Sequence, residues 1–249
     1  MNFHIRAFLF LITLFFLNSI SFSQLEMWKH YDKTNSGLPT NCIRQVVQDK
    51  KGIYWIATLD SGLVRFDGKN WKVYNKSNSP IPHNYIYSID FDKFGYIWIG
   101  TYGGGLVRFN GKDDWKIFNE SNSGLPCNWI YTVAIDKYSN VWIGTSNGGF
   151  AIYNRKKWKV YNTENSILKE HKVTYIYFDK YNDAWIGTSG LMYRIKKGKW
   201  FSEEQFNYDS VDDACYWITE DGNKNVYFCY KFGSIVFYDW KKFTIYSPP

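Results

Sequence analysis

The stretch Ile97-Trp98-Ile99-Gly100-Thr101 decides the fold, because close copies of it recur along the chain. Its tryptophan is repeated as Trp55, Trp142 and Trp185, and Tyr227 holds the same place in a fifth, more divergent copy. Successive anchors are separated by 43, 44, 43 and 42 residues. A period in the forties is typical of architectures in which each repeat is one structural unit. The sequence therefore predicts five copies of one unit.

Each copy contains four short runs of β-forming residues separated by turns. In the first copy these runs are Ile43–Gln48, the segment around Trp55, residues 62–66, and Trp71–Tyr74. An acid, here Asp49, stands six residues before each anchor and opens a glycine- or asparagine-bearing turn. Such turns between strands are hairpin signals. One copy is therefore predicted to be a four-stranded antiparallel meander.

The meanders are predicted to assemble into a β-propeller. A lone meander with two apolar faces cannot bury both, so copies must stack, and strand twist turns the stack into a ring. The predicted fold is all-β, a single domain over residues 24–249. Its five blades are centred on residues 41–75, 84–119, 128–162, 171–203 and 213–246. The anchor tryptophans should be largely buried between blades. The innermost strands should supply one core layer: Val46, Ile89, Val133, Ile176 and Ile218.

One segment resembling a fourth strand is in excess. Residues 28–31 precede the first copy, whereas the last copy already has Phe243–Tyr246 in that place. Either this segment closes the ring by pairing with residues 235–238 of the last blade, or the chain is an arc of a longer array. We expect a closed ring.

Residues 1–23 are predicted to be a signal peptide. Arg6 precedes an apolar run at residues 7–17, and the small residues Ser21 and Ser23 follow. No cysteine follows the run for lipid attachment, and no later segment is apolar enough to span a bilayer. The mature product is expected to be periplasmic or secreted, with an uncleaved signal anchor as the alternative.

The overall charge is modestly positive, and aromatic residues make up 21% of the chain, which excludes a disordered protein. A net charge of +7 favours solubility and attraction to acidic partners. Binding to nucleic acid is not expected of an exported protein. The basic residues of the predicted hairpin turns are interpreted as a solvated rim: Lys50, Lys51, Lys69, Lys112, Arg155, Lys156, Lys157, Lys196, Lys197, Lys241 and Lys242.

Cys215 and Cys229 flank the predicted Asp221-Gly222 hairpin and should therefore lie on neighbouring strands. The geometry of cross-strand disulfides is strained, so we expect them to be thiols.

Three phrases resemble a known family: Trp98-Ile99-Gly100-Thr101, the Gly-Gly-Leu-Val-Arg-Phe run ending at Phe109, and the Asn-Ser-Gly-Leu-Pro run ending at Pro126. They look like the two-component regulator propeller repeat of bacterial extracytoplasmic sensors. The resemblance implies a propeller outside the membrane, in other members joined to a transmembrane helix and a histidine kinase and often responsive to oligosaccharides. This sequence contains no kinase, so the resemblance leaves a ligand-binding or assembly role.

A candidate binding site lies where the fourth strand of one copy leads into the first strand of the next. Polar residues stand fourteen positions before each anchor: Asn41, Asn84, Asn128, His171 and Asp213. Their neighbours differ between copies: Arg44, Tyr85, Tyr87, Trp129, Tyr131 and Tyr216. Aromatic rings beside amides and a guanidinium suit a sugar ligand. The alternative is that these amides bond their own turns and the aromatic rings belong to the core.

Catalytic patterns are weak. The histidines His30, His83 and His171 lack metal-ligand spacing, and neither Ser-His-Asp nor P-loop patterns occur. We therefore predict a non-enzymatic propeller, without cofactor or metal, that binds an oligosaccharide or an extracytoplasmic protein. One alternative is a propeller glycosidase or polysaccharide lyase using two of the acids Asp60, Asp90, Asp212 and Asp213. Another is a structural fragment of a longer two-component sensor.

Overall fold

Twenty β-strands form five four-stranded antiparallel sheets in the computed structural model, which describes residues 29–202, 214–230 and 233–246. The chain divides into two units, Met1–Leu38 and Pro39–Pro249, and every sheet belongs to the second. The predicted all-β, five-bladed propeller is confirmed. The described residues include no helix with the length and apolar character needed to cross a membrane. The predicted signal peptide lies outside the described residues.

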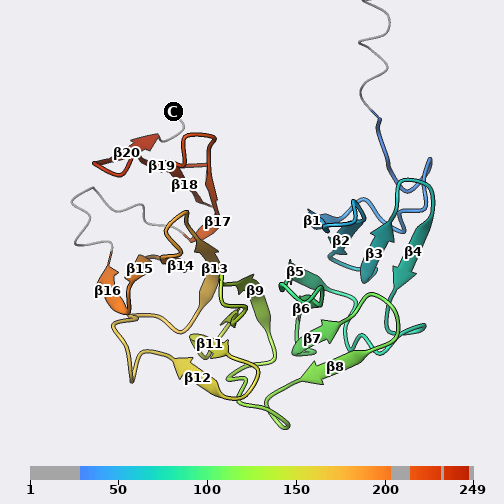
Figure 1. Ribbon diagram of the computed structural model, residues 1–249, viewed down its shortest axis with the longest axis horizontal. Coiled ribbons are helices and arrows are strands. Elements are labelled where there is room, and N and C mark those ends of the chain that lie inside the picture. The colour runs from blue at the N-terminus through green and yellow to red at the C-terminus, as the bar shows by residue number, and fades with distance from the viewer. Residues whose placement is uncertain (1–28, 203–213, 231–232, 247–249) are drawn as a thin grey trace, which may run out of the picture. The chain divides into compact units, whose positions relative to one another are not determined.

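Each sheet is one blade, and its strands follow in chain order from the inside outward (Figure 1). Blades 1 and 2 comprise β1 (Ile43–Gln48), β2 (Tyr54–Thr58), β3 (Leu63–Phe66), β4 (Trp71–Tyr74), β5 (Ile86–Phe91), β6 (Ile97–Thr101), β7 (Leu106–Phe109) and β8 (Trp115–Phe118). Blade 3 comprises β9 (Ile130–Ile135), β10 (Val141–Thr145), β11 (Phe150–Tyr153) and β12 (Trp158–Tyr161). Blades 4 and 5 comprise β13 (Val173–Phe178), β14 (Ala184–Thr188), β15 (Met192–Lys196), β16 (Lys199–Ser202), β17 (Cys215–Glu220), β18 (Val226–Tyr230), β19 (Ile235–Tyr238) and β20 (Phe243–Tyr246).

The repeated acid and tryptophan form one local module in blades 1 to 4. In blade 2, one carboxylate oxygen of Asp92 accepts the backbone N–H groups of Phe94 and Tyr96 and so shapes the turn between β5 and β6. The other oxygen accepts Nε1–H of Trp98 at 2.8 Å. Asp49, Asp136 and Asp179 bond the tryptophans of their own blades in the same way. The six-residue spacing in the sequence is the spacing of this bond.

Consecutive blades meet at a joint, where the anchor tryptophan of one blade packs against an aromatic ring of the next. Ring centroids lie 6.1 Å apart for Trp55 and Phe109, and 5.0 Å apart for Trp185 and Phe228. The prediction that the anchors are largely buried is confirmed for Trp55, Trp98 and Trp185. Trp142 is partly buried and lines a pocket at its joint, so it is covered less completely than the other three anchors.

The predicted core layer is confirmed in four blades and wrong in the first. Ile89, Val133, Ile176 and Ile218 are buried against the preceding blade, whereas Val46 is 54% exposed. The inner strands pack in the sequence β1, β5, β9, β13 and β17. Within the described ranges, β17 makes no comparable packing against β1, so the expected closure of blade 5 on blade 1 is not found.

The expected pairing of residues 28–31 with the last blade is also not found. The outer edge of β19 is paired with β20, and residues 29–31 form no strand; Trp28 lies outside the described residues. Cys215 and Cys229 lie on the neighbouring strands β17 and β18, as predicted, and both are thiols rather than a disulfide. The register sets Cys229 opposite Trp217, so the two thiols are not directly opposed.

Candidate functional site

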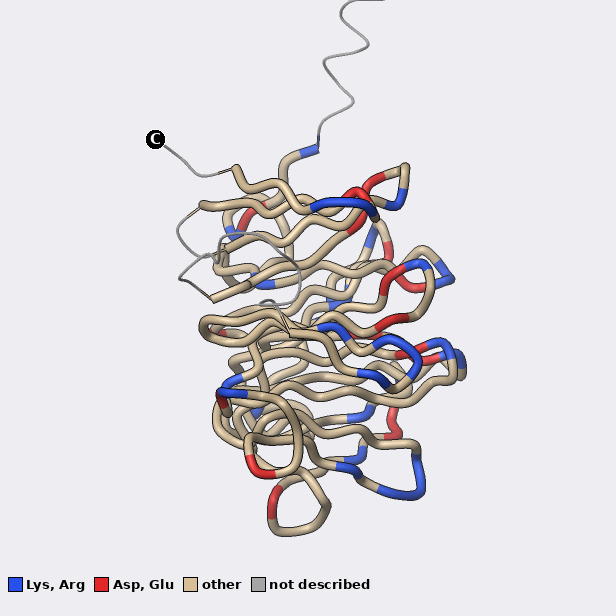
Figure 2. The backbone as a smooth tube through the Cα atoms, turned by 90° about the vertical axis from the view of Figure 1, so that its left-hand side faces the viewer, with Lys and Arg blue, Asp and Glu red and all other residues tan. Residues whose placement is uncertain are grey.

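Two kinds of connection share one face of the propeller. One is the loop that leaves the fourth strand of a blade and enters the next blade. It accepts hydrogen bonds from the other, which is the turn between the second and third strands of the blade that the loop leaves. Gly105 N–H donates to the carbonyl of Asn128, and Gly149 N–H to that of His171. Gly105 has a φ of 83°, and an added Cβ would lie 2.2 Å from the carbonyl oxygen of Phe118, so only glycine fits. Charged segments gather on one side of the blades in Figure 2.

Side chains of the predicted polar ring form hydrogen bonds within these loops. The side-chain oxygen of Asn84 accepts the N–H of Lys76, and that of Asn128 accepts the N–H of Glu120, both at 2.9 Å. His171 bonds the Thr163 hydroxyl through Nε2. These three residues therefore follow the alternative in which each side chain bonds its own turn. Asn41 is exposed in the loop before β1, and Asp213 lies outside the described residues.

The predicted aromatic residues come together around a tyrosine that the sequence reasoning missed. We define the mouth cluster as Tyr85, Tyr87, Tyr102, Trp129 and Tyr131. The ring of Tyr102 lies 4.5 Å from that of Trp129 and 5.5 Å from that of Tyr87, between centroids. Its N–H also donates to the carbonyl of Tyr85 at 3.1 Å. Tyr102 follows β6 directly, on the same face as the loops, and this position could have revealed it.

Two members of the mouth cluster present their rings to solvent. Tyr85 is 44% exposed and Trp129 is 46% exposed. Tyr87 and Tyr131 are half-buried and meet edge to face, with centroids 5.3 Å apart. Burial raises the pKa of both phenols, and Tyr102 adds to the effect. Both therefore remain protonated at neutral pH and can donate hydrogen bonds.

Two cations and a further tyrosine adjoin this cluster. The guanidinium carbon of Arg44 lies 5.7 Å from the Tyr87 ring centre, and the ammonium of Lys172 lies 5.1 Å from that of Tyr131. Tyr216, in blade 5, is half-buried and contributes to the raised pKa values of Tyr87 and Tyr131. Of the predicted site residues, the aromatic group and Arg44 are thus brought together, and the polar ring is not part of that group.

His83 was also missed as a neighbour of this cluster. Its Nδ1 accepts the backbone N–H of Tyr85 at 3.1 Å, and the two rings lie 5.4 Å apart. Burial, with the nearby Lys76 ammonium, lowers the pKa of His83. The imidazole is therefore neutral at neutral pH and supports the position of Tyr85.

The acids considered for catalysis have structural partners. Asp60 accepts the Thr40 hydroxyl at 3.0 Å, and Asp90 accepts the N–H of Ile135 in the next blade at 2.8 Å. Burial raises the pKa of Asp90 to about 6. Asp212 and Asp213 lie outside the described residues. Across the described chain, no three His, Cys, Asp or Glu side chains are grouped so as to hold a metal ion.

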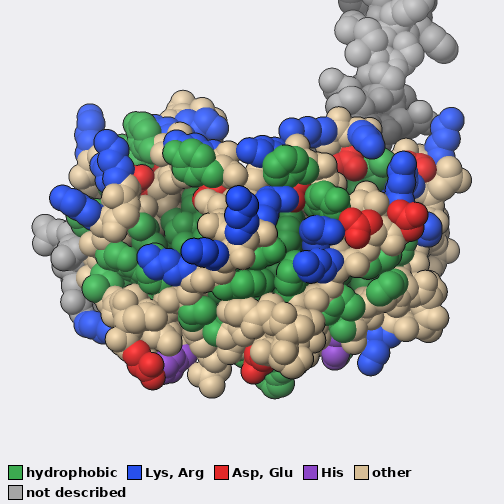
Figure 3. Space-filling view, turned by 60° about the horizontal axis from the view of Figure 1, so that its bottom comes forward, with side chains coloured by type: hydrophobic (Ala, Val, Ile, Leu, Met, Phe, Trp, Pro, Cys, Tyr) green, Lys and Arg blue, Asp and Glu red, His purple; other side chains and the backbone are tan. Residues whose placement is uncertain are grey.

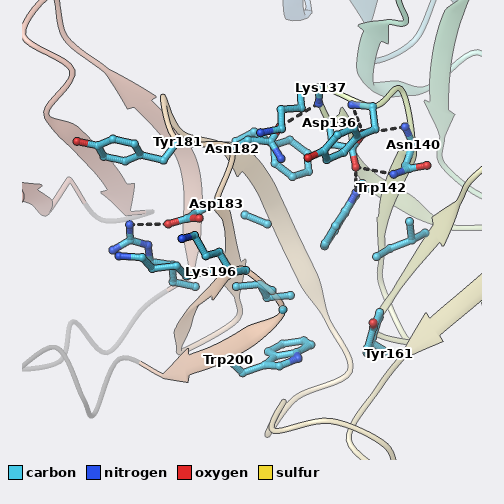
Figure 4. A pocket seen from close by; sticks show the side chains of 18 of the residues that line it. Asp136, Lys137, Asn140, Trp142, Tyr161, Tyr181, Asn182, Asp183, Lys196 and Trp200 are labelled. Carbon is cyan, nitrogen blue, oxygen red and sulfur yellow. Dashed lines mark hydrogen bonds and ion pairs between the residues drawn. The ribbon is translucent and has the colours of Figure 1, made fainter.

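A pocket of about 940 Å³ lies at the joint between blades 3 and 4, on the side of the hairpin turns, and extends to Tyr238 and Trp240 of blade 5 (Figure 4). We call it the joint pocket. Asp136 and Trp142 of blade 3 line it together with Asp183, Lys196 and Trp200 of blade 4. The sequence reasoning missed it, because the lining residues come from separate blades.

The pattern described as two component regulator propeller matches residues 37–60, 80–103 and 124–147. Each match covers the loop that enters a blade and the first two strands of blade 1, 2 or 3. These three segments are therefore similar to the two component regulator propeller repeat. The resemblance seen in the sequence is thereby confirmed. A comparison with curated protein sequences gives no match.

Solved structures share the fold of these repeats. The extracellular domain of the hybrid two component system BT3049 from B. thetaiotaomicron is 22% identical with a TM-score of 0.66, over 83% of this chain and 28% of that one. The extracellular domain of the one component system BT4673 from the same organism is 22% identical with a TM-score of 0.67, over 85% and 29%. This chain thus spans less than a third of either domain. Virginiamycin B lyase from Staphylococcus aureus is 15% identical with a TM-score of 0.67, over 83% and 70%.

Proposed function

We propose that this chain is an extracytoplasmic, sensor-type propeller that binds an oligosaccharide at the mouth cluster and catalyses no reaction. The half-exposed rings of Tyr85 and Trp129 on either side of Tyr102 carry this proposal. The repeats support it, because two of the similar structures are extracellular domains of signalling systems. The extracellular location of these two domains also supports a periplasmic or secreted location for this protein.

The chemistry of the cluster suits a sugar. Aromatic faces can pack against the apolar C–H faces of a pyranose ring, while a few polar groups fix its orientation. The protonated phenols of Tyr87 and Tyr131 supply donors, and Arg44 and Lys172 supply positive charge beside them. The ligand class that fits is therefore a neutral or weakly acidic glycan.

Calorimetric titration with neutral and uronate-bearing oligosaccharides tests the proposal. The joint change Tyr85→Ala and Trp129→Ala should abolish binding, because it removes both exposed stacking surfaces. Tyr246→Ala is the matched control, since Tyr246 is 59% exposed and lies on β20 outside this cluster. Circular dichroism melting should show that all variants fold.

Full affinity in the double variant would contradict the site. Cleavage of the oligosaccharide by the wild-type protein would instead favour the glycosidase or lyase alternative. Detection of protein partners alone, bound to the lysine-bearing hairpin turns, would move the interaction to the other face.

A further inference from the structure

The inner strand of every blade contains a β-bulge at the same place. Between β1 and β2 the register passes from Ile43 opposite Thr58 to Gln45 opposite Ala57, so one residue of β1 has no partner on β2. The same shift recurs in the other four blades. The extra residue stands eleven positions before each anchor and is, in chain order, Arg44, Tyr87, Tyr131, Thr174 and Tyr216. A bulge redirects a side chain and is common beside binding sites.

Four of these five side chains lie close together, and we call them the bulge group: Arg44, Tyr87, Tyr131 and Tyr216. They come from β1, β5, β9 and β17, which lie around the centre of the propeller in Figure 1. The guanidinium of Arg44 is 5.7 Å from the Tyr87 ring centre, and the rings of Tyr87 and Tyr131 are 5.3 Å apart. After burial, Tyr216 adds to the raised pKa of both phenols. The fifth extra residue, Thr174, is buried and donates to the carbonyl of Cys215 at 2.6 Å.

Arg44 differs from the other arginines of the described ranges, because no acid lies beside it. The other four each form an ion pair: Arg65 with Asp67, Arg108 with Asp114, Arg155 with Asp92, and Arg194 with Asp183. Arg44 is half-buried, and within residues 29–202, 214–230 and 233–246 its guanidinium forms neither an ion pair nor a hydrogen bond. A cation that has lost part of its hydration in this way is stabilised by an anion.

The phenols beside Arg44 also lack acceptors. The hydroxyl groups of Tyr87, Tyr131 and Tyr216 form no hydrogen bond with any residue that the structure describes. Lys172, at the entry to β13, is half-buried with its ammonium 5.1 Å from the Tyr131 ring centre, and it too forms no ion pair among the described residues. Two cations and three hydroxyl groups are thus gathered without an acceptor for them.

The acids of the surrounding loops and inner strands are engaged elsewhere. Each accepts a hydrogen bond from a backbone or hydroxyl group: Asp60 from the Thr40 hydroxyl, Glu120 from the Asn128 N–H, Glu170 from the Gly190 N–H, and Asp90 from the N–H groups of Phe91 and Ile135. The described part of these elements therefore supplies donors and positive charge to the bulge group but no carboxylate.

We propose that the bulge group and Lys172 bind the carboxylate of a uronic acid residue, with Arg44 holding it through two N–H groups and the phenols of Tyr87 and Tyr131 donating to it. A carboxylate fits the planar guanidinium, and such charge-assisted pairs are strong. A neutral sugar would leave Arg44 without an acceptor. This inference rests on the proposed function, because the sugar ring that carries the carboxylate would stack on the mouth cluster.

Calorimetric titration with two matched pairs of trisaccharides tests the inference. The acids are α-1,4-linked trigalacturonate and β-1,4-linked trimannuronate, and each is compared with its fully methyl-esterified form. Esterification removes the charge and keeps the sugar rings. In at least one pair the acid should bind at least about tenfold more tightly than the ester, because only the acid forms charge-assisted hydrogen bonds.

Two arginine variants separate direct contact from general attraction. Arg44→Gln should weaken binding of the acid at least about tenfold and leave that of the ester unchanged. Basic side chains are spread over the face shown in Figure 3, so an acidic ligand is also attracted at long range. Arg65→Gln is the matched control, because it removes the same charge from the same blade at a residue already paired with Asp67. It should change the affinity less than about twofold, since salt screens such distant charges.

The double variant Tyr87→Phe and Tyr131→Phe keeps the inference falsifiable if Arg44→Gln fails to fold. It removes two hydroxyl groups and keeps both rings, and it should weaken binding of the acid at least about fivefold, more than that of the ester. Full affinity for the acid in this variant would contradict the assigned donors.

The outcomes distinguish this inference from the proposed function. Equal affinity for acid and ester, lost in the variant with Tyr85→Ala and Trp129→Ala, would overturn the carboxylate site and leave the mouth cluster as a sugar site. Binding of the acid that survives that variant would do the reverse. Equal weakening by Arg44→Gln and Arg65→Gln would reduce the effect to long-range attraction and overturn the inference. No binding of any of the four trisaccharides would also overturn it, whereas neutral oligosaccharides test the proposed function separately.

Discussion

In the joint between blades 2 and 3, Arg155 reaches Asp92, and Asp90 and Ser88 accept backbone N–H groups of blade 3 at 2.8 and 3.0 Å. The joint between blades 3 and 4 has an exposed lysine in place of the arginine and contains the joint pocket. Its corresponding inner-strand bond, from Ile176 N–H to the hydroxyl of Thr132, is 3.4 Å long.

The difference shows that the repeat builds blades more strictly than it builds joints. All five blades keep four paired strands, because the turn acid and the anchor act within a few residues. A joint depends on single side chains that approach from the neighbouring blade, as Arg155 does from 63 residues away. The replacement of one such residue leaves the blade intact but loosens the packing between the two blades.

The largest expected contrast is between two anchor tryptophans. Trp98→Ala should lower the free energy of unfolding by about 3–5 kcal/mol, because Trp98 is buried and bonded to Asp92 at 2.8 Å. Trp142→Ala should cost about 1–3 kcal/mol, because part of this ring already contacts solvent. Urea denaturation of the two variants measures both values. Equal losses would mean that the joint pocket does not weaken the packing around Trp142.

The next contrast concerns pH. Burial raises the pKa of Asp90 in the fold from 3.8 to about 6, so the folded state favours the protonated acid. Below about pH 4 Asp90 is protonated in both the folded and the unfolded chain, and its burial costs no ionisation energy. The free energy of unfolding therefore falls as the pH rises from about 4 to about 6, where Asp90 ionises in the fold. The total loss is about 3 kcal/mol, at about 1.4 kcal/mol for each pH unit of the difference.

Asp90→Asn should remove this dependence, because the amide does not ionise. The variant should gain stability relative to the wild type between pH 4 and 7, and the gap should stay constant above pH 7. Thermal denaturation at several pH values checks it. If the stability difference between the variant and the wild type does not change with pH, Asp90 has the same pKa in the folded and the unfolded chain. Blade 3 has Ala134 at this position, so the joint between blades 3 and 4 lacks the effect.

Features within a blade could be predicted from the sequence, whereas features of the joints between blades could not. The strands β1 and β4 have the predicted bounds, because apolar alternation and turn residues are local signals. The aromatic part of the candidate site was predicted from its place at the strand entries. The exposure of Val46 and the environment of Trp142 could not be predicted, because each depends on which side chains the neighbouring blade presents. Tyr102 could have been found from its position directly after β6.

The smallest expected contrast separates two hydroxyl groups on the inner strands. Ser88→Ala should cost about 1–2 kcal/mol, because it leaves the buried N–H of Val133 without its acceptor at 3.0 Å. Thr132→Val keeps the shape of the side chain and removes only an acceptor 3.4 Å from Ile176 N, beyond the usual range for such a bond. Its cost should be under about 1 kcal/mol. Hydrogen exchange can resolve the two joints separately: the Val133 amide should lose protection in Ser88→Ala, and the Ile176 amide should change little in Thr132→Val. A larger loss at Ile176 than at Val133 would mean that the joint between blades 3 and 4 relies on its inner-strand bond to offset the pocket, and that its hollow is confined to the hairpin side.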